Sequence, residues 1–309
     1  MFSESYERLV LVLKMRKIIK RNDIVAVNGH NHTKVSDGKL NSCELLILNI
    51  LCGFKKVFVT DHNDLVWGGK EKFCAKFISK LIGTEFCPGI EFSCFFDLSD
   101  FGGNNKTEFH IVGLGVDPQN VGVKETIKKI QSGREDITRR ILENIRRVGF
   151  SIISFDELKE KSGGNITLPD IARNVREKDG GSVDAEDFIR EHLSRGSDCF
   201  VSNDTLISSA DAIEIIKEAG GFPVWGHPKD SLGDFFDTHF EQVGSVLREM
   251  EIGGIEAFRD NHSACDVRKI EKFCIDNDLE IRAGSDMHEA RDLFSYMRNI
   301  IKVLEDGDL

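Results

Sequence analysis

The stretch VNGHNHTKVSDG, residues 27–38, decides which fold and which chemistry we expect of this chain. His30 and His32 stand one residue apart, directly after the apolar run IVAV, and Asp37 follows in the next loop. Residues i and i+2 of an extended segment face the same side, so both imidazoles can approach one point. The competing interpretation is a polar loop with an accidental pair of histidines, and the rest of the chain decides between the two.

Further β-type runs follow, each succeeded by a helix-type or loop segment. Apolar runs of this length with helical periodicity between them predict repeated βα units and a mostly parallel sheet. The alternation favours a closed layout over an open sheet, so we expect an α/β fold in the form of a distorted (β/α)7 barrel. The seven runs cover residues 23–28, 55–60, 86–93, 108–115, 221–226, 253–258 and 279–284.

Nearly every run carries a His, Asp or Glu at or near its C-terminal end. A β/α barrel builds its active site at that face, whereas a chance scattering would also populate the opposite ends and the helices. His192 and His239 fall outside the pattern, and we expect them to be exposed helical histidines. Any one member could be an ordinary structural residue, so the joint pattern carries the prediction. The polar residues at the later runs are Asp61, His62, Glu91, His110, His227, Glu256, His262, Asp286 and His288.

Histidines and carboxylates without clustered cysteines suit Zn, Mn or Fe. The set exceeds what one tetrahedral ion uses, so we predict two or three divalent metal ions, with Glu91 as a bridging carboxylate. Three carboxylates against two or three divalent cations leave a positive pocket, in which a phosphate group would settle. The predicted metal ligands are His30, His32, Asp37, His62, Glu91, His110, His227, Asp286 and His288.

The overall composition limits which binding partners and which cellular compartment we expect. A formal net charge of −11 argues against a broad electrostatic grip on double-stranded DNA or on an anionic membrane. The apolar run near the N-terminus is too short to span a membrane. The eight cysteines form no CxxC pair, and most have apolar neighbours, where free thiols pack as small hydrophobes. We therefore expect a reducing compartment and a cytoplasmic location.

The rhythm of strands and helices divides the chain. Residues 117–205 hold no good strand and several charged helical patterns, which predict a helical insertion subdomain between two barrel units. Residues 23–116 and 206–309 are then the barrel domain. Residues 1–22 are expected to form an N-terminal helical extension packed on the body.

Several of these motifs, in this order, resemble the PHP (polymerase and histidinol phosphatase) family of metal-dependent phosphoesterases. The motifs are HNHTKVSDG, TDHN, PGIEFS, HIVGLG, HP, GIEAFRDNHS and GSDMH, and they cover residues 24–288. The helical insertion resembles the TrpH/YciV-like branch, which includes nucleoside 3′,5′-bisphosphate phosphatases and RNA 5′-end exonucleases. The resemblance implies a distorted seven-stranded PHP barrel, a helical subdomain over the site, and a trinuclear metal site at the nine positions given above.

Five positions depart from the family pattern. Asn28 stands where the branch usually has Asp, and Asn63 replaces the Asp that usually follows the TDH motif. In the insertion, Leu168-Pro169-Asp170 replaces the usual Arg-Pro-His, which puts the substrate in doubt more than the chemistry. Glu289 replaces the usual Gly after GSDMH.

The resemblance implies hydrolysis of a phosphate monoester by a metal-activated hydroxide. We expect a small nucleotide-like substrate, AMP or a nucleoside 3′,5′-bisphosphate. The alternatives are 5′–3′ exonuclease activity on short RNA ends, histidinol-phosphate phosphatase activity, and a non-catalytic metal- or nucleotide-binding module. His262, Asp286 and His227 are the candidate catalytic residues, with His262 as phosphate contact or proton donor. Arg134 and Arg139 of the insertion are candidate substrate contacts.

Overall fold

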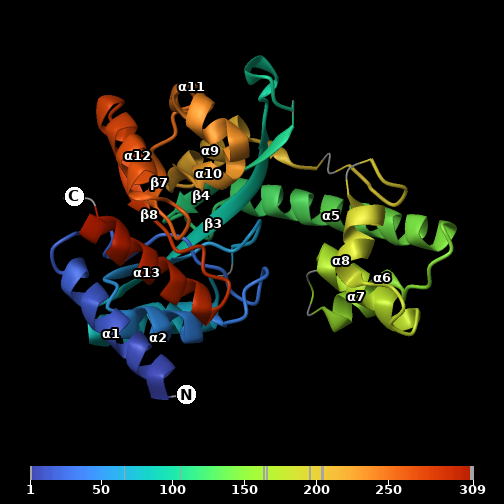
Figure 1. Ribbon diagram of the computed structural model, residues 1–309, viewed down its shortest axis with the longest axis horizontal. Coiled ribbons are helices and arrows are strands. Elements are labelled where there is room, and N and C mark those ends of the chain that lie inside the picture. The colour runs from blue at the N-terminus through green and yellow to red at the C-terminus, as the bar shows by residue number, and fades with distance from the viewer. Residues whose placement is uncertain are drawn as a thin grey trace. The chain divides into compact units, whose positions relative to one another are not determined.

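The computed structural model describes residues 2–65, 67–104, 106–162, 164, 166–194, 196–202 and 205–306 (Figure 1). The chain divides into two compact units. Met1–Glu125 with Ile207–Leu309 form the barrel unit, and Thr126–Leu206 form the insertion unit. Helix α5, Val121–Arg147, begins in the first unit and continues in the second.

The barrel unit is built on a mixed sheet with the strand order β1-β2-β3-β4-β6-β7-β8, and β5 pairs with β3. β4 is antiparallel to both β3 and β6, whereas the other neighbours are parallel. The sheet nearly closes on itself, because the N–H of Gly29 donates to the carbonyl of Ala283 and Asn31 pairs with Met287. The strands are β1 (Val27–Asn28), β2 (Lys56–Val59), β3 (Glu85–Phe96), β4 (Thr107–Leu114), β5 (Ile207–Ser208), β6 (Phe222–Trp225), β7 (Gly254–Phe258) and β8 (Glu280–Ala283).

The distorted barrel predicted from the sequence is confirmed, and each of the seven predicted runs contains a strand. The departure from a purely parallel sheet lies at β3 and β4. Only a short segment joins them, and a crossover between parallel strands needs a dozen residues or more, so the two strands pair as an antiparallel hairpin. Strand β5 was not predicted, because two residues carry no readable periodicity.

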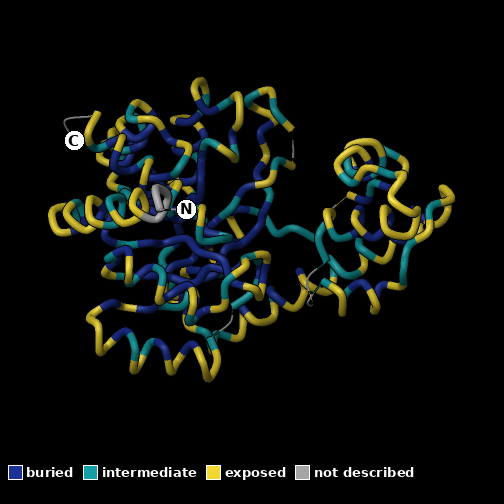
Figure 2. The backbone as a smooth tube through the Cα atoms, turned by 60° about the horizontal axis from the view of Figure 1, so that its bottom comes forward, coloured by how far each residue is buried: buried dark blue, intermediate teal, exposed yellow. Residues whose placement is uncertain are grey.

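Helices cover the outside of the sheet, so the strands are buried while the outward sides of the helices are exposed (Figure 2). Trp225 stacks between Phe109 and Phe240, with ring centroids 5.6 Å apart on both sides. This stack fixes β4 and β6 against α11. The helices of the unit besides α5 are α1 (Phe2–Ile19), α2 (Ser42–Cys52), α3 (Gly69–Phe73), α4 (Lys80–Ile82), α9 (Ser209–Glu218), α10 (Pro228–Leu232), α11 (Phe236–Glu249), α12 (Ala264–Asp276) and α13 (Ala290–Asp306).

Helix α2 follows directly from the HNH motif and has clear signals at both ends. The side chain of Asn41 accepts from the N–H groups of Cys43 and Glu44, and the Glu44 side chain accepts from the N–H of Asn41, a capping box. Gly53 ends the helix at φ +100°, the left-handed conformation typical of a C-cap glycine. Helix α1 adjoins α2 and α13. None of the described helices is long and apolar enough to cross a membrane.

One pair of cysteines departs from the expectation of free thiols. Cys43 at the start of α2 and Cys74 after α3 form a disulfide, and they lie 31 residues apart in the chain. That pairing joins segments distant in sequence and leaves no short spacing motif to predict it from. The other cysteines are free, and among them Cys52, Cys94, Cys199 and Cys274 are buried.

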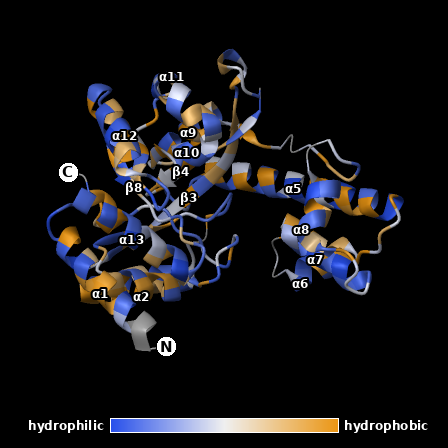
Figure 3. Ribbon diagram, in the orientation of Figure 1, coloured by the Kyte–Doolittle hydropathy of each residue, from blue (hydrophilic) through white to orange (hydrophobic). Residues whose placement is uncertain are grey.

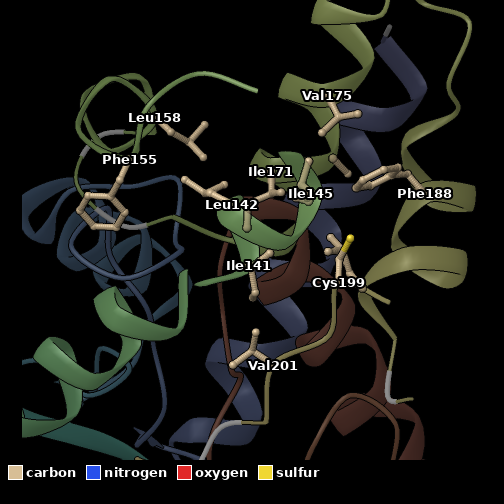
Figure 4. Close-up of a cluster of buried hydrophobic side chains, with 12 residues drawn as sticks. Ile141, Leu142, Ile145, Phe155, Leu158, Ile171, Val175, Phe188, Cys199 and Val201 are labelled. Carbon is tan, nitrogen blue, oxygen red and sulfur yellow. The ribbon is translucent and has the colours of Figure 1, made fainter. Parts of the chain in front are cut away.

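The insertion unit has an apolar core of its own (Figure 4). Ile145 of α5, Phe188 of α8 and Val175 of α7 are almost completely buried in it. Its elements after α5 are α6 (Phe155–Lys161), α7 (Leu168–Lys178), α8 (Ala185–Phe188) and the π-helical segment Ile189–Leu193. The insertion unit thus has a hydrophobic core that is separate from the core of the barrel.

Candidate metal centre

The first and last strands meet at the HNH motif and the GSDMH motif. The N–H of His32 donates to the carbonyl of Met287 (2.9 Å), and the N–H of Asp286 donates to that of His30 (3.0 Å). These backbone bonds bring the two ends of the barrel domain side by side, although about 255 residues separate them. Both imidazoles are fully buried and point at the same acid groups, as the i, i+2 spacing predicts.

Glu91 of β3 lies at the centre of the site and is fully buried. Its carboxylate contacts five imidazoles that come from different segments of the barrel unit. The distances are 2.7 Å to His110 Nδ1, 2.9 Å to His62 Nδ1, 3.1 Å to His30 Nε2, 3.1 Å to His227 Nε2 and 3.2 Å to His32 Nε2. A carboxylate placed among imidazoles in this way could ligate divalent cations together with them.

Two further carboxylates complete the cluster. Asp286 Oδ1 lies 2.9 Å from His32 Nε2 and 3.5 Å from His30 Nε2. Asp37 lies 3.3 Å from His288 Nε2 and 3.7 Å from the nearer nitrogens of His32 and His62. The structure thus joins all nine predicted ligands in one connected cluster. Three overlapping groups in it could each hold an ion: His32, Asp37, His62 and His288; His30, His32, Glu91 and Asp286; and His62, Glu91 and His110.

The acidic and imidazole groups of the cluster shift one another's pKa values, so that the carboxylates are charged and attract cations. Burial would raise the pKa of Glu91, yet His30, His62 and His110 outweigh burial and hold it well below its usual range. Conversely, burial lowers the pKa of His110, but the charge of Glu91 and a hydrogen bond with Glu108 raise it to about 10. Burial opposes a raised pKa of His288 as well, and Asp37 and Asp286 lift it to about 9. Protons and metal ions therefore compete for the same nitrogens.

Several buried atoms of the cluster make no hydrogen bond, although they lie close to one another. They are His30 Nε2, His32 Nε2, His62 Nδ1, His227 Nδ1 and Glu91 Oε2. A buried polar atom without a partner costs free energy, so the fold keeps these atoms for another purpose. Imidazole nitrogens and carboxylate oxygens converging from both sides are the donor set that divalent Zn, Mn or Fe prefer. The residues present therefore fit divalent metal ions.

Glu256 supports the cluster from behind, a role that the sequence analysis did not assign to it. Its Oε1 accepts from His30 Nδ1 (3.0 Å), and its Oε2 accepts from the backbone N–H of His227 (2.8 Å). This leaves Nε2 of His30 turned toward the acid groups of the cluster, the arrangement that fixes a metal-ligating imidazole. Gly284 permits it, because a Cβ there would lie 2.2 Å from Glu256 Oε1.

Arg259 is a second residue that the sequence analysis missed. It is almost completely buried, and its Nη2 donates to Asp286 Oδ2 at 3.1 Å. Burial works against its charge, but Asp286 and Glu256 raise its pKa above the usual range. Arg259 thus holds the outer oxygen of Asp286 while the inner oxygen faces His32. The motif GIEAFRDNHS contains the signal, since a lone Arg after a buried strand needs acidic partners.

The Asn at position 28 takes part in a buried polar network. Its amide donates to Asn31, Asn49 and the hydroxyl of Ser285, and its oxygen accepts from the N–H of Ser285. Ser285 precedes Asp286, so Asn28 fixes the backbone that presents this carboxylate. Asn28 therefore helps to orient a candidate ligand by hydrogen bonding, although it lacks the charge of the usual Asp.

Three of the five described non-glycine residues with positive φ lie at the same place. His227, Asp286 and Asn63 have φ values of +30°, +49° and +46°. Non-glycine residues rarely adopt this conformation, and it persists where the surroundings over-determine it. Two of the three are candidate ligands. Asn63, which replaces the usual Asp, donates its N–H to the Glu91 carbonyl and accepts from the N–H of Ser93, so it positions β3.

His262, a predicted catalytic and phosphate-contacting residue, is buried and makes a local contact. Its Nδ1 donates to the carbonyl of Ala257 (2.8 Å), and its ring stacks on Phe236. Burial lowers its pKa to about 4, so the imidazole is neutral at pH 7. Its Nε2 is buried without a hydrogen bond, and its role as phosphate contact or proton donor stays a prediction.

The predicted substrate contacts Arg134 and Arg139 belong to the insertion unit. The guanidinium of Arg139 lies 3.8 Å from the ring centroid of Phe155 and 3.6 Å from Asp156. The carbonyl of Arg134 accepts from the Thr138 hydroxyl. Their role toward a substrate stays a prediction.

Of the two histidines expected to be exposed outside the site, His239 on α11 is only half-exposed, because its ring lies against Phe101 and Phe235. His192 is partly buried, pairs with Asp198 and packs on Phe188. In the insertion unit Asp170, which replaces a family His, accepts from Thr167 in the capping box of α7. Near the site, Glu289, which stands where the family usually has Gly, forms an ion pair with Lys39.

Comparison with known proteins agrees with this geometry. The chain is 26% identical over 264 residues to 3′,5′-nucleoside bisphosphate phosphatase of Chromobacterium violaceum, covering 85% of this chain and 87% of the relative. It is 23% identical over 261 residues to phosphoribosyl 1,2-cyclic phosphate 1,2-diphosphodiesterase of Eggerthella lenta, covering 84% and 92%. No family model matches the chain.

Solved structures give the same result for the fold. An amidohydrolase from Chromobacterium violaceum, solved with bound sulfate and no metal, superposes with a TM-score of 0.66 at 26% identity and covers 85% of this chain and 87% of that one. A structure from Bifidobacterium adolescentis has a TM-score of 0.65 at 21% identity, with coverage of 85% and 88%. This second likeness supports the barrel alone.

The nearly closed barrel, the cluster at its strand ends and these similarities define a class, the metal-dependent phosphoesterases, which are hydrolases acting on phosphoric ester bonds. Within that class, these similarities support the PHP family and its TrpH-like branch, which the sequence motifs resemble. The resemblance identified from the sequence is thereby confirmed.

Proposed function

We propose that the protein is a phosphatase that removes a phosphate monoester group from a small nucleotide-like substrate, AMP or a nucleoside 3′,5′-bisphosphate. Two or three divalent ions (Mn, Fe or Zn) would be held by the nine clustered side chains. The observation that carries the proposal is Glu91, a fully buried carboxylate in contact with five imidazoles. No structural role in the barrel requires so many nitrogen and oxygen atoms without hydrogen bonds at one point.

Divalent ions at such a site supply Lewis-acid charge to phosphoryl oxygens and lower the pKa of a bound water. The chain's own residues prepare that chemistry. Three carboxylates, Glu91, Asp37 and Asp286, neutralise only part of the charge of two or three divalent ions, so a dianionic phosphate is attracted. Glu256 and Arg259 hold His30 and Asp286 in position before the substrate arrives.

Three observations bear on the nature of the substrate. The relative named as a nucleoside bisphosphate phosphatase favours a nucleotide with a terminal phosphate. The net charge of −11 favours a small substrate over a long polyanion. Leu168 and Asp170 replace family residues of the insertion, so the contacts to the leaving group need not be those of the relative.

A second candidate function is cleavage of a phosphodiester, as in 5′–3′ trimming of short RNA. The similarity to a relative named as a diphosphodiesterase favours it. The same donor set serves both reactions, because the attacked phosphorus and the in-line geometry are alike.

Release of inorganic phosphate tests the proposal. Metal-free protein would be reloaded with Mn²⁺ and offered adenosine 3′,5′-bisphosphate, AMP, histidinol phosphate and a 5′-phosphorylated trinucleotide. We expect turnover of the first or second substrate to exceed that of the others by at least about tenfold, with the Asp286→Asn variant inactive. Turnover confined to the trinucleotide would establish the second candidate. Stoichiometric metal without turnover of any of them would contradict both and leave a binding module.

A further inference from the structure

A helical segment on the outside of the barrel unit exposes large apolar side chains. The segment comprises α3, the π-helical turns Cys74–Ser79 and α4, and so runs through residues 69–82. Phe73 and Phe77 are each 56% exposed and their rings lie 4.9 Å apart, and Leu81 is 87% exposed. Positions 73, 77 and 81 share one side of a helix, so these residues form a continuous apolar ridge.

Lysines flank this ridge. Lys70, Lys72, Lys76 and Lys80 are all exposed. The one acidic residue of the segment, Glu71, is turned inward, where its carboxylate accepts from the Ser42 hydroxyl and the N–H of Gly68. The outward side of the segment thus combines positive charge with apolar side chains and carries no carboxylate. We call Lys70, Lys72, Phe73, Lys76, Phe77, Lys80 and Leu81 the basic apolar face.

The helices next to it continue the same chemistry. Helix α2 adjoins α3 and exposes Ile47 (48%) and Leu51 (59%), and α1 adjoins α2 and exposes Leu9 and Leu13. Figure 3 shows the apolar residues gathered on α1 and α2. The Cys43–Cys74 disulfide joins α2 to the segment that follows α3.

The charge of the protein is distributed unevenly. Residues 6–21 and 69–82 hold ten of the 41 Lys and Arg residues but only two of the 52 Asp and Glu residues. All ten of these cationic side chains are exposed. A local excess of positive charge therefore sits on α1 and on the basic apolar face, although the chain as a whole is strongly acidic.

A groove between α1 and α13 has the same character. Its volume is about 560 Å³, its floor includes Val10, Leu11 and Ile301, and its edges carry five cationic and two acidic side chains. Apolar floor and basic edge together suit an amphiphile with an anionic head. The charged residues at the edges are Arg8, Lys14, Arg291, Arg298, Lys302, Glu7 and Glu305.

We propose that the basic apolar face, with α1 beside it, docks the protein on the surface of a bilayer that contains anionic phospholipids. Large apolar side chains between lysines are the composition of helices that lie in the membrane interface. Phe73, Phe77 and Leu81 would enter the boundary between head groups and acyl chains. The lysine stems would lie along the apolar surface with their ammonium groups among the lipid phosphates.

The charge pattern favours a lipid surface over the other partners. A second copy of the chain would set the lysines of one face against those of the other, which costs free energy. A nucleic acid would satisfy the lysines, yet it would leave Leu81 and the leucines of α1 in water. An anionic surface with an apolar interior takes up both kinds of side chain.

Co-sedimentation of the full chain with vesicles tests the proposal. We expect binding to vesicles of equal parts phosphatidylcholine and phosphatidylglycerol, little binding to phosphatidylcholine alone, and weaker binding at high salt. The Lys76→Glu/Lys80→Glu variant should bind at least about tenfold more weakly. The Phe77→Ser/Leu81→Ser variant should lose binding while circular dichroism and phosphatase turnover stay unchanged.

Helix α12 offers matched controls within the same unit. It exposes Arg268, Lys272 and Ile275, the last at 72%. Arg268→Glu/Lys272→Glu and Ile275→Ser change the same charge and the same kind of side chain away from the face, and both should bind like the unaltered protein. Equal loss in test and control variants, or no binding of the unaltered chain to anionic vesicles, overturns the proposal. Dimerisation through this face, seen by light scattering, or tighter binding to an oligonucleotide than to vesicles, overturns it as well.

Discussion

The barrel unit and the insertion unit use polar residues for different purposes. At the strand ends of the barrel, polar side chains are buried against one another, and Glu91 alone contacts five imidazoles. In the insertion unit, Ser154, Thr167 and Asp184 cap helices at the surface, and the core is apolar. The barrel thus buries polar side chains that could ligate metal ions. The insertion unit places its polar side chains at helix ends, where they stabilise the fold. Substitutions in the two units should therefore separate catalysis from stability.

The largest effect is expected at the centre of the cluster. Glu91→Gln keeps the shape of the side chain and removes the charge that faces the five imidazoles, so divalent ions should be retained poorly. We expect kcat/KM for phosphate release to fall at least about a thousandfold, which corresponds to about 4 kcal/mol, together with a loss of bound Mn²⁺ in elemental analysis. Glu108→Gln is the matched control, because Glu108 is exposed and contacts only the outer nitrogen of His110. Similar activities in the two variants would remove Glu91 from its central role.

The next effect should be confined to the insertion unit. Phe188 is almost completely buried in its core, 5.0 Å from the ring centroid of Phe150. Phe188→Ala leaves a cavity and should lower the free energy of unfolding by about 3–4 kcal/mol. Hydrogen exchange would report faster opening of amides in α7 and α8, while metal content stays unchanged. Phe240→Ala, at the Trp225 stack of the barrel, is the counterpart and should impair metal retention. Loss of metal from the Phe188 variant would show that the two units are not independent.

Much of the barrel and of the cluster could be predicted from the sequence, because both depend on patterns among a few neighbouring residues. An apolar run predicts a strand without knowledge of its neighbours, and a ligand near its end is visible in the same few residues. His30 and His32 needed only the i, i+2 rule. The hairpin of β3 and β4 escaped prediction as antiparallel, since its direction depends on pairing and not on the pattern of either strand.

What the sequence left out depends on contacts between distant residues. Glu256 was noted at its strand, but its contacts with His30 and with the backbone of His227 appear only once β7 lies beside the cluster. The same holds for Arg259 with Asp286. A bulk net charge of −11 is an average and hides a basic surface on α1 and residues 69–82.

A smaller effect, dependent on pH, is expected at His262. Its pKa of about 4 in the fold lies below the ordinary 6.5, so the native state favours the neutral imidazole. Above pH 6.5 the contribution to stability is complete. As pH falls toward 4, the unfolded chain takes up a proton and the folded one does not, so stability decreases. His262→Asn keeps a donor for the Ala257 carbonyl and removes the titration.

The measurement is the free energy of unfolding in urea at several pH values. The unaltered protein should lose about 2–3 kcal/mol more than His262→Asn between pH 6.5 and pH 4. Both proteins would be metal-free, so that loss of metal does not contribute. If the free energy of unfolding of both proteins depended on pH in the same way, His262 would take up a proton in the fold as readily as in the unfolded chain. That result would support its predicted role as a proton donor.

The smallest effect compares one helix cap from each unit. Thr167 accepts from the N–H of Asp170 at the start of α7, and Ser208 accepts from that of Asp211 at the start of α9. Replacing either hydroxyl residue by Ala removes one capping hydrogen bond and should cost about 1 kcal/mol. Thr167→Ala should affect only the insertion unit, whereas Ser208→Ala should destabilise the barrel unit, because α9 adjoins β3 and β4.

Differential scanning calorimetry with Mn²⁺ bound distinguishes the two variants, since metal shifts only the transition of the unit that binds it. If Thr167→Ala lowered the metal-dependent transition as much as Ser208→Ala, the cap at Asp170 would act on the metal centre, and the loss of the family His at that position would bear on catalysis directly.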